Sequence, residues 1–251
     1  FVRKESIIYM EGVTVSFDGF LALKELSFYM DYGELRSMIG PNGAGKSTML
    51  DVICGKTRAT KGRVLFGKND VNITKMPEHD IVKAGVGRKF QNPSIFSNLS
   101  VFENFELSLR KTRGVFFTLF AKTTSKDREK IFSVLETVGL TEKANEKAGA
   151  LSHGEKQWVE IGMVIAQDPE LVLLDEPVAG MSIQETERTA ELILSISKNH
   201  SVLVIDHDMD FIRDISQKVT VLHDGTILCE GTMDEVQKDQ RVIEKYLGRE
   251  E

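Results

Sequence analysis

Cysteine is scarce in this chain of 251 residues, which contains Cys54 and Cys229 and no others. The two lie far apart in the sequence and form neither a CxxC pair nor a metal-binding spacing. This excludes a fold that depends on a disulfide framework or on a cysteine-bound structural metal. We interpret both residues as buried, reduced thiols of a cytosolic protein.

Long hydrophobic runs are missing as well. The longest candidate, "GVFFTLFA" at 114–121, is much shorter than the roughly 20 apolar residues that a membrane-spanning helix requires. With 41% hydrophobic and 28% charged residues, the composition is that of a soluble globular chain and argues against intrinsic disorder. If the protein works at a membrane, other subunits must hold it there.

Positive charge is in deficit. The chain has 32 Lys and Arg against 38 Asp and Glu, which gives a formal net charge of −6. An acidic chain is a poor general binder of nucleic acid, because binding requires clustered cations that face the phosphate backbone. A nucleic-acid partner is therefore not expected.

Apolar patterning predicts strands in both terminal parts of the chain and helices between them. The expected strands and hairpins are 7–17, 22–30, 34–40, 62–70, 171–175, 201–206 and 219–231. Helices are expected at 46–54, across 93–162, and after the capping boxes that begin at Ser182 and Thr232. Gly139 is well placed to end an amphipathic helix within the helical part. This order predicts an α/β fold whose parallel core is interrupted by a helical lobe.

The segment "GPNGAGKST", residues 40–48, matches the pattern G-x-x-x-x-G-K-[ST] in full, between a predicted strand and a predicted helix. Glycines let the backbone wrap closely around phosphate oxygens, so that successive N–H groups and the helix start form an anion site. Lys46 supplies a cation for the β- and γ-phosphates, and the Ser47 hydroxyl can bind Mg²⁺. The predicted nucleotide-binding residues of this loop are Gly40, Asn42, Gly43, Ala44, Gly45, Lys46, Ser47 and Thr48.

The segment "LVLLDEP", residues 171–177, places two carboxylates directly after a continuous apolar strand. In a doubly wound sheet this strand end lies beside the phosphate loop. Asp175 is then expected to hold Mg²⁺ through water, and Glu176 to polarise the water that attacks the γ-phosphate. An acidic pair is a weak signal by itself and becomes a strong one beside a phosphate loop.

Two further polar residues fit the same site. Gln91 in "RKFQNP" stands at the start of a loop, where its amide can contact both Mg²⁺ and the attacking water. His207 follows the apolar strand 201–206 and is expected near the γ-phosphate and Glu176. We assign both to catalysis and Gln91 also to the metal, and the assignment of Gln91 rests in part on a family resemblance.

The segments "GPNGAGKST", "FQNP", "LSHGEKQ", "LVLLDEP" and "VIDHD", in this order, make the chain resemble the ATP-binding subunit of ABC transporters over essentially its whole length. The resemblance implies one ABC ATPase domain, 1–251, with a P-loop NTPase (RecA-like) core. Residues 1–92 and 163–251 would form an N-terminal antiparallel β subdomain together with this core, and 93–162 an inserted helical subdomain. It also implies that ATP is hydrolysed with Mg²⁺, and that Phe17 stacks on adenine, with Phe20 as the rival.

The signature segment "LSHGEKQ", residues 151–157, lies far past the phosphate loop. In the family that the chain resembles, two subunits pack head to tail, and the signature helix of one caps the γ-phosphate bound by the other. Ser152 and the backbone of Gly154, at a helix N-terminus, are therefore expected to complete an anion site across an interface. Nucleotide would hold this dimer together, and hydrolysis would release it.

Finer detail favours one branch of the family. The segments "FQNPSIFSNLSVFEN", "LSHGEKQWVEIGM" and "DEPVAGMS" are similar to the branched-chain amino acid and urea importers, and "GRKFQNP", "HGEKQW" and "PVAGM" are closer to the urea transporter subunit. The resemblance implies a second, different ATP-binding subunit, two membrane-spanning permease subunits and, indirectly, a substrate-binding protein. The chain would then lie at the cytoplasmic face of the plasma membrane. Urea is the expected solute, and branched-chain amino acids are the other option.

Departures from the family pattern bear on the site. The common signature is L-S-G-G-Q, and this chain has His153 and Glu155 at its third and fifth places. The Glu155 carboxylate would weaken capping of the partner's phosphate unless it points away or is neutralised. The segment "VAGMS" lacks the Asp common in the wider family, which casts doubt on whether two sites of a heterodimer are equally active.

Three alternatives stay open. A soluble ABC-type ATPase acting on ribosomes or DNA usually has two such domains or long coiled coils, and this chain has one domain and no heptads. A nucleotide-gated interaction module without hydrolysis would not need Glu176. The run 114–121 is either part of a core or a surface that meets the permease.

Overall fold

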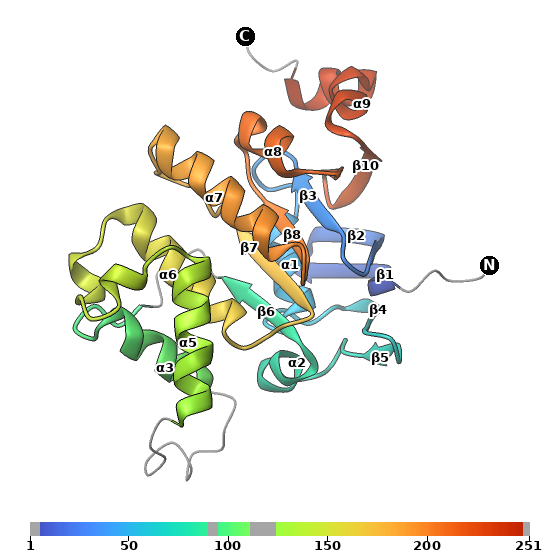
Figure 1. Cartoon of the computed structure of the whole chain (residues 1–251). Coiled ribbons are helices and arrows are strands. Elements are labelled where there is room, and N and C mark those ends of the chain that lie inside the picture. Colours follow the sequence, from blue (N-terminus) through green and yellow to red (C-terminus); the bar gives the residue numbers. More distant parts are fainter. Residues whose placement is uncertain (1–5, 90–94, 111–123, 248–251) are drawn as a thin grey trace.

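The computed structural model describes residues 6–89, 95–110 and 124–247, and its strands form two sheets (Figure 1). The first sheet is antiparallel, with strand order β2-β1-β4-β5, and consists of β1 (Ser6–Phe17), β2 (Phe20–Asp31), β4 (Lys61–Phe66) and β5 (Val71–Asn72). The second, with order β10-β9-β3-β8-β7-β6, consists of β3 (Leu35–Ile39), β6 (Val86–Lys89), β7 (Leu171–Asp175), β8 (Ser201–Ile205), β9 (Lys218–His223) and β10 (Thr226–Gly231). Its strands pair in parallel except for β9 with β10. The predicted α/β fold with a parallel core is what the structure shows.

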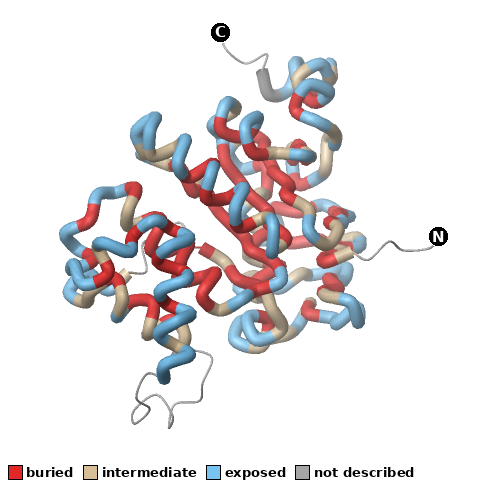
Figure 2. Tube along the Cα trace, viewed as in Figure 1, coloured by how far each residue is buried: buried red, intermediate tan, exposed pale blue. Residues whose placement is uncertain are grey.

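Both faces of the six-stranded sheet are covered, which explains its continuous apolar strands. In β7, Leu171 and Leu173 pack with the antiparallel sheet and α1, whereas Val172 and Leu174 pack with the helices of the opposite face. Buried residues accordingly run along these strands (Figure 2). The helices of the core are α1 (Lys46–Ile53), α2 (Glu78–Ala84), α7 (Ile183–Ile196), α8 (Met209–Ile215), α9 (Met233–Lys238), α10 (Gln240–Val242) and the π-helical η3 (Ile243–Leu247).

A helical lobe lies beside β6 and away from the antiparallel sheet (Figure 1). It is built from α3 (Val101–Arg110), α5 (Ser125–Thr137), the short η1 (Thr141–Lys143) and η2 (Ala148–Ala150), and α6 (His153–Ile165). The three α-helices contact one another, and α6 also contacts β6 and α7. Residue 162, the expected boundary of the helical part, falls inside α6, so this helix joins the lobe to the core.

Most local predictions hold in the structure. The predicted capping boxes that begin at Ser182 and Thr232 are formed, and Ser152 caps α6 in the same way. Gly139, with a φ of 66°, ends α5, and the β9–β10 hairpin turns through Asp224 and Gly225, both with positive φ. Helix α2 and strand β6 are not predicted from the apolar pattern, because both are too short to repeat it.

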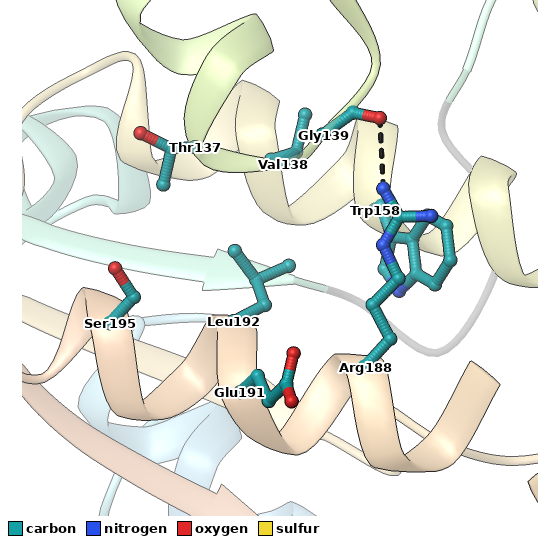
Figure 3. A pocket seen from close by; sticks show the side chains of 8 residues that line it. All are labelled: Thr137, Val138, Gly139, Trp158, Arg188, Glu191, Leu192 and Ser195. Carbon is teal, nitrogen blue, oxygen red and sulfur yellow. Dashed lines mark hydrogen bonds between the residues drawn. The ribbon is translucent and has the colours of Figure 1, made fainter. Parts of the chain in front are cut away.

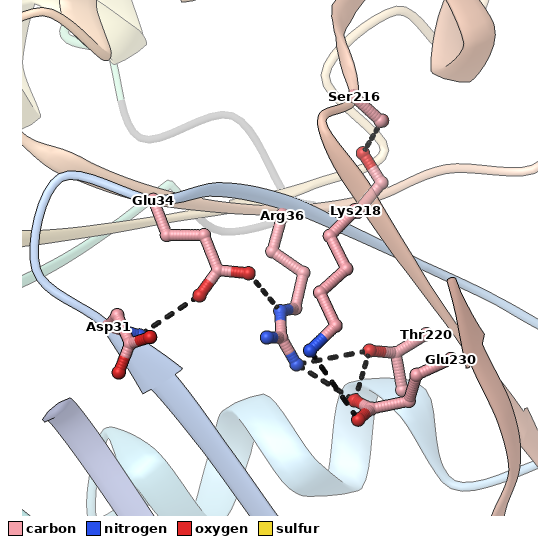
Figure 4. A network of polar contacts seen from close by, with 8 residues as sticks. Asp31, Glu34, Arg36, Ser216, Lys218, Thr220 and Glu230 are labelled. Atoms are coloured by element: carbon pink, nitrogen blue, oxygen red, sulfur yellow. Dashed lines mark hydrogen bonds and ion pairs between the residues drawn. The ribbon is translucent and has the colours of Figure 1, made fainter. Parts of the chain in front are cut away.

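Arg36 of β3 is buried, with 1% of its side chain exposed, inside a polar network (Figure 4). Its Nε donates to Glu34 Oε1 at 2.7 Å, and its Nη1 donates to Glu230 Oε1 at 2.8 Å. Glu230 of β10 also accepts the Thr220 hydroxyl at 2.8 Å and pairs with the Lys218 ammonium at 3.7 Å. The guanidinium therefore ties β3 to the β9–β10 edge of the sheet that carries the site.

Arg36→Met is expected to lower the free energy of unfolding by about 3 kcal/mol, because it removes the guanidinium that donates to both the Glu34 and the Glu230 carboxylates and leaves Glu230 with the more distant Lys218 ammonium. Denaturant unfolding followed by circular dichroism measures the change. Arg63→Met is the control, since Arg63 and Glu11 form an ion pair with about half of each side chain exposed, and should cost less than about 1 kcal/mol. Equal, small losses in both variants would mean that the buried network does not stabilise the sheet.

Candidate functional site

The loop between β3 and α1 depends on glycine at two positions. Gly45 has a φ of 103°, and a Cβ there would lie 2.6 Å from the Ala22 carbonyl oxygen. Gly40 has a φ of 151° and lies even more closely against the Leu222 carbonyl. The backbones of strands β2 and β9 therefore pack against the loop on two sides. The helix α1 begins directly after it at Lys46, so its N-terminal N–H groups face the loop.

Lys46 points its ammonium back over the loop. The Nζ donates to the Gly40 carbonyl at 2.7 Å and to the Pro41 carbonyl at 3.0 Å. Burial lowers the pKa of Lys46, and the nearby carboxylates of Glu176 and Asp175 oppose this shift. The cation thus lies between the phosphate loop and the carboxyl end of β7.

A cavity of about 270 Å³ opens beside the loop. Its lining combines two aromatic rings, the loop backbone and one carboxylate, and consists of Phe17, Phe20, Ala22, Asn42, Gly43, Gly45, Lys46, Ser47, Thr48 and Glu176. Phe17 and Phe20 oppose each other at the end of the β1–β2 hairpin, with 49% and 66% of their surfaces exposed. Exposed phenyl rings beside a phosphate loop suit the flat face of a purine base. Both residues are placed for this contact.

Asp175 ends β7 in a buried position. Arg88 of the neighbouring strand β6 donates from Nη2 to Asp175 Oδ2 at 3.0 Å, and its Nη1 pairs with Asp51 of α1. Burial raises the pKa of Asp175, and the Arg88 guanidinium opposes the shift. Arg88 is not among the predicted site residues. The feature of the sequence that could have pointed to it is a basic residue three positions before Gln91.

Glu176 follows in a left-handed conformation, with a φ of 48°, which is uncommon for a residue with a side chain. Its N–H donates to the Ile205 carbonyl at 2.8 Å, so β8 holds it in place. Glu176 lines the first cavity and also a second one of about 320 Å³, which Gly40, Pro41, Asn42 and His207 share. The structure thus brings Glu176, His207 and the phosphate loop together, as the sequence predicts.

The signature segment begins α6. The Ser152 hydroxyl accepts the Glu155 N–H at 3.2 Å, and Glu155 Oε2 accepts the Ser152 N–H at 3.0 Å, which forms a reciprocal capping box. Glu155 Oε1 pairs with the Lys143 ammonium at 2.7 Å. Burial alone would raise the pKa of Glu155, but Lys143 and the Ser152 N–H outweigh it and lower the pKa. The carboxylate is therefore engaged in its own helix cap and neutralised by Lys143, which is one of the two conditions under which it would not weaken capping of a partner's phosphate.

The predicted site residues separate into two groups, one around the cavities at the phosphate loop and one at the start of α6. Ser152 and Gly154 line neither of the two cavities, and they belong to the helical lobe, whereas α1 lies against the core sheets (Figure 1). Gln91 and the run 114–121 lie outside the described residues.

The helical lobe is fastened to α7 around Trp158, a residue without a predicted role (Figure 3). Arg188 of α7 stacks its guanidinium 4.2 Å from the Trp158 ring centroid and donates from Nη2 to the Gly139 carbonyl at 2.9 Å. Trp158 Nε1 donates to the Thr189 hydroxyl at 2.9 Å. These contacts surround a small pocket of about 160 Å³ and hold α6 beside the N-terminal half of α7.

Of the predicted metal ligands, Ser47 and Asp175 lie within the described residues, where they offer a hydroxyl and a carboxylate. Within the described ranges, no group of three or more His, Cys, Asp or Glu could hold a metal ion by itself. Mg²⁺ in nucleotide sites takes one or two protein ligands and completes its shell with phosphate and water oxygens. A hydroxyl and a carboxylate beside a phosphate loop fit that pattern.

No helix in the described part of the chain combines the length and apolarity needed to cross a bilayer.

Comparison with known proteins gives consistent matches. The family profile described as ABC transporter matches residues 23–179, and that of the branched-chain amino acid ATP-binding cassette transporter matches 226–251. The chain is 32% identical over 253 residues to the high-affinity branched-chain amino acid transport ATP-binding protein LivG of Escherichia coli (strain K12), with 97% of this chain and 98% of LivG covered.

Solved structures agree with these matches. The ADP conformation of an ATP-binding cassette of an ABC transporter superposes with a TM-score of 0.87 at 30% identity, and covers 97% of this chain and 99% of its own. A dimeric post-hydrolysis cassette bound to ADP and Pi superposes with a TM-score of 0.76 at 26% identity, over 90% of this chain and 98% of its own. The predicted P-loop fold is thereby confirmed.

Proposed function

The chain belongs to the ABC transporter family as an ATP-binding subunit that hydrolyses ATP, and from this premise we propose that ATP is enclosed between the phosphate loop of one subunit and the signature segment of another. One observation carries the proposal. Lys46, Glu176 and His207 gather around the phosphate loop, whereas Ser152 and Gly154 lie at the N-terminus of α6, the signature tip, and line neither cavity. A tip outside the cavities of its own chain is available to a second chain.

Each residue has a distinct task in this proposal. Adenine stacks on Phe17 or Phe20, and the triphosphate lies along residues 40–48. The Lys46 ammonium exchanges its two carbonyl partners for β- and γ-phosphate oxygens. Glu176 takes up a proton from the attacking water, and His207 hydrogen-bonds the γ-phosphate from the adjoining cavity.

We assign Mg²⁺ to Ser47 and Asp175, with Gln91 as a further ligand. When bound, the ion neutralises charge on the phosphate oxygens. Burial raises the pKa of Asp175, and a divalent cation beside the carboxylate favours its ionised form. The assignment is supported by the chemistry of the donor atoms and by the position of Asp175 at the end of β7.

ATP-binding subunits of this family work as dimers with transmembrane permease subunits. We further infer that two permeases hold this chain at the cytoplasmic face of the plasma membrane. A second ATPase of different sequence would be its dimer partner, and a substrate-binding protein would supply the solute. Ser152 and the Gly154 N–H would donate to the γ-phosphate held by that partner.

We propose a small solute as the cargo. The name of LivG and the profile matched by 226–251 support branched-chain amino acids, and the segments "GRKFQNP", "HGEKQW" and "PVAGM" favour urea. Action on ribosomes or DNA has less support, since the relatives matched over nearly their full length are transport subunits. Reconstitution with the permeases and binding protein tests the solute: ATP hydrolysis should rise with leucine or with urea, and a response to neither would contradict both.

Ser152→Arg is expected to change ATP binding to the isolated chain by less than about twofold while it abolishes most hydrolysis, because a long side chain then fills the space between two chains. Titration with a fluorescent ATP analogue measures binding, and phosphate release measures turnover. Ser133→Arg, at an exposed position of α5 in the same lobe, should leave both unchanged. Loss of ATP binding in monomeric Ser152→Arg would place the signature segment in the site of its own chain.

A further inference from the structure

The signature tip already carries an anion from its own chain. Glu185, in the first turn of α7, accepts the Ser152 hydroxyl on Oε1 at 3.1 Å. Gly154 lies directly against the same oxygen, since a Cβ there would lie 2.5 Å from Oε1, and its N–H contributes to lowering the pKa of the carboxylate. The other oxygen, Oε2, accepts the N–H and the hydroxyl of Ser182 at 3.0 and 3.1 Å. One oxygen of this carboxylate caps α7, and the other holds the tip of α6.

We propose that Glu185 is a positioning residue that competes with the partner's γ-phosphate for the signature tip, an inference that rests on the proposed function. A hydroxyl and a backbone N–H each have one hydrogen, so Ser152 and Gly154 cannot donate fully to a carboxylate and to a phosphate together. Two anions that approach the same donors would also repel each other. Formation of the ATP-bound dimer therefore requires that the Glu185 carboxylate leave the tip.

Two further contacts hold α6 to α7 and to the segment that precedes it. The His153 Nε2 lies 3.0 Å from the Ala179 carbonyl oxygen, in the segment that leads from Glu176 to α7. The Arg188–Trp158 stack fastens α6 to α7 one to two turns further along (Figure 3). Release of the Glu185 carboxylate thus frees the donors of Ser152 and Gly154, while the rest of α6 stays attached to α7 through the Arg188–Trp158 stack. In the isolated chain the carboxylate takes the place of the phosphate and keeps the tip's donors satisfied.

The ionisation of Glu185 is consistent with this role. The Ser182 N–H, together with the donors of Ser152 and Gly154, lowers the pKa of Glu185. The side chain is therefore a carboxylate near neutral pH, and it attracts the same donors that an incoming phosphate requires.

Glu185→Gln separates the two tasks of the side chain. Glutamine supports a capping box, so α7 should still begin at Ser182, but the negative charge at the tip is removed. In a Glu176→Gln background, in which ATP should stay bound, we expect the ATP concentration for half-maximal dimer formation to fall about tenfold. Sedimentation velocity at fixed protein concentration measures the dimer. The ATP affinity of the monomer is titrated in a Ser152→Arg background, and Glu185→Gln should not change it. A general disturbance of the fold would instead lower this affinity.

Glu187→Gln is the matched control, since Glu187 is exposed on the same helix and the substitution changes the charge equally. Its half-maximal ATP concentration should stay within about twofold of the parent. Glu185→Ala should shift dimer formation in the same direction as Glu185→Gln and also lower the melting temperature, because the Ser182 N–H loses the carboxylate half of the α7 capping box. If Glu185→Gln and Glu187→Gln form dimers at the same half-maximal ATP concentration, competition between Glu185 and the phosphate is refuted, while the ATP site shared by two chains is not. If Glu176→Gln itself stays monomeric at saturating ATP, the proposed function fails first.

Discussion

Glu176→Gln is expected to lower the turnover of ATP about 10²- to 10⁴-fold, the range that a positioned general base contributes. Glutamine preserves the shape of the side chain at the end of β7, but its amide cannot take up a proton from water. ATP should still bind, because the phosphate loop and Lys46 are untouched. Since bound ATP then persists between two chains, dimers should accumulate. Phosphate release measures turnover, and light scattering after size exclusion measures the dimer.

The same substitution at an exposed glutamate of α7, Glu187→Gln, should keep the turnover of the unmodified protein. Normal hydrolysis in Glu176→Gln would eliminate this residue as the base. Loss of both hydrolysis and ATP binding would also contradict the assignment, because it would indicate that Glu176 shapes the pocket and does not act on the water.

Lys46→Ala is expected to weaken ATP binding about 10²- to 10³-fold, because one ammonium contributes charge-assisted hydrogen bonds to both the β- and γ-phosphates. Alanine favours the helix that begins at this position, so α1 should still form. The Gly40 and Pro41 carbonyls, which accept from Lys46, lie at the loop and can bind water after the change. Titration with a fluorescent ATP analogue gives the affinity.

Lys198→Ala removes a lysine at an exposed position after α7 and serves as the charge-matched control. It should bind ATP as the unmodified chain does. An unchanged affinity in Lys46→Ala would mean that the nucleotide does not use the phosphate loop.

Local structure was predictable where a few neighbouring residues determine it. The caps at Ser182 and Thr232 and the turn at Asp224 depend on side chains within four positions, so their patterns are visible in the sequence. Strand β6 is different, because its four residues include Arg88 and the buried Lys89, and charged residues are rarely expected inside a sheet. Their burial depends on carboxylates that come from distant parts of the chain.

The residues of the candidate site were also predictable only where they lie in a contiguous motif. The phosphate loop and Glu176 lie in contiguous motifs and could be assigned from them. Arg88, which pairs with Asp175, could not, because that contact forms only when β6 lies beside β7. Glu185 is recognisable in the sequence as a helix cap, but its contact with Ser152 depends on how α6 packs against α7.

In the purified protein the second ATPase is absent, and two copies of this chain take both places of the dimer. Mixing two inactive variants of this chain then tests most directly whether each ATP site is made by two chains. Lys46→Ala lacks a working phosphate loop but keeps its signature tip, and Ser152→Arg has the opposite defect. A mixed dimer would contain one complete site, because the intact loop of one chain faces the intact tip of the other. An equimolar mixture should hydrolyse ATP at about a quarter of the unmodified rate, since half of the dimers are mixed and each holds one of two sites. A mixture no more active than the two variants measured separately would contradict a shared site.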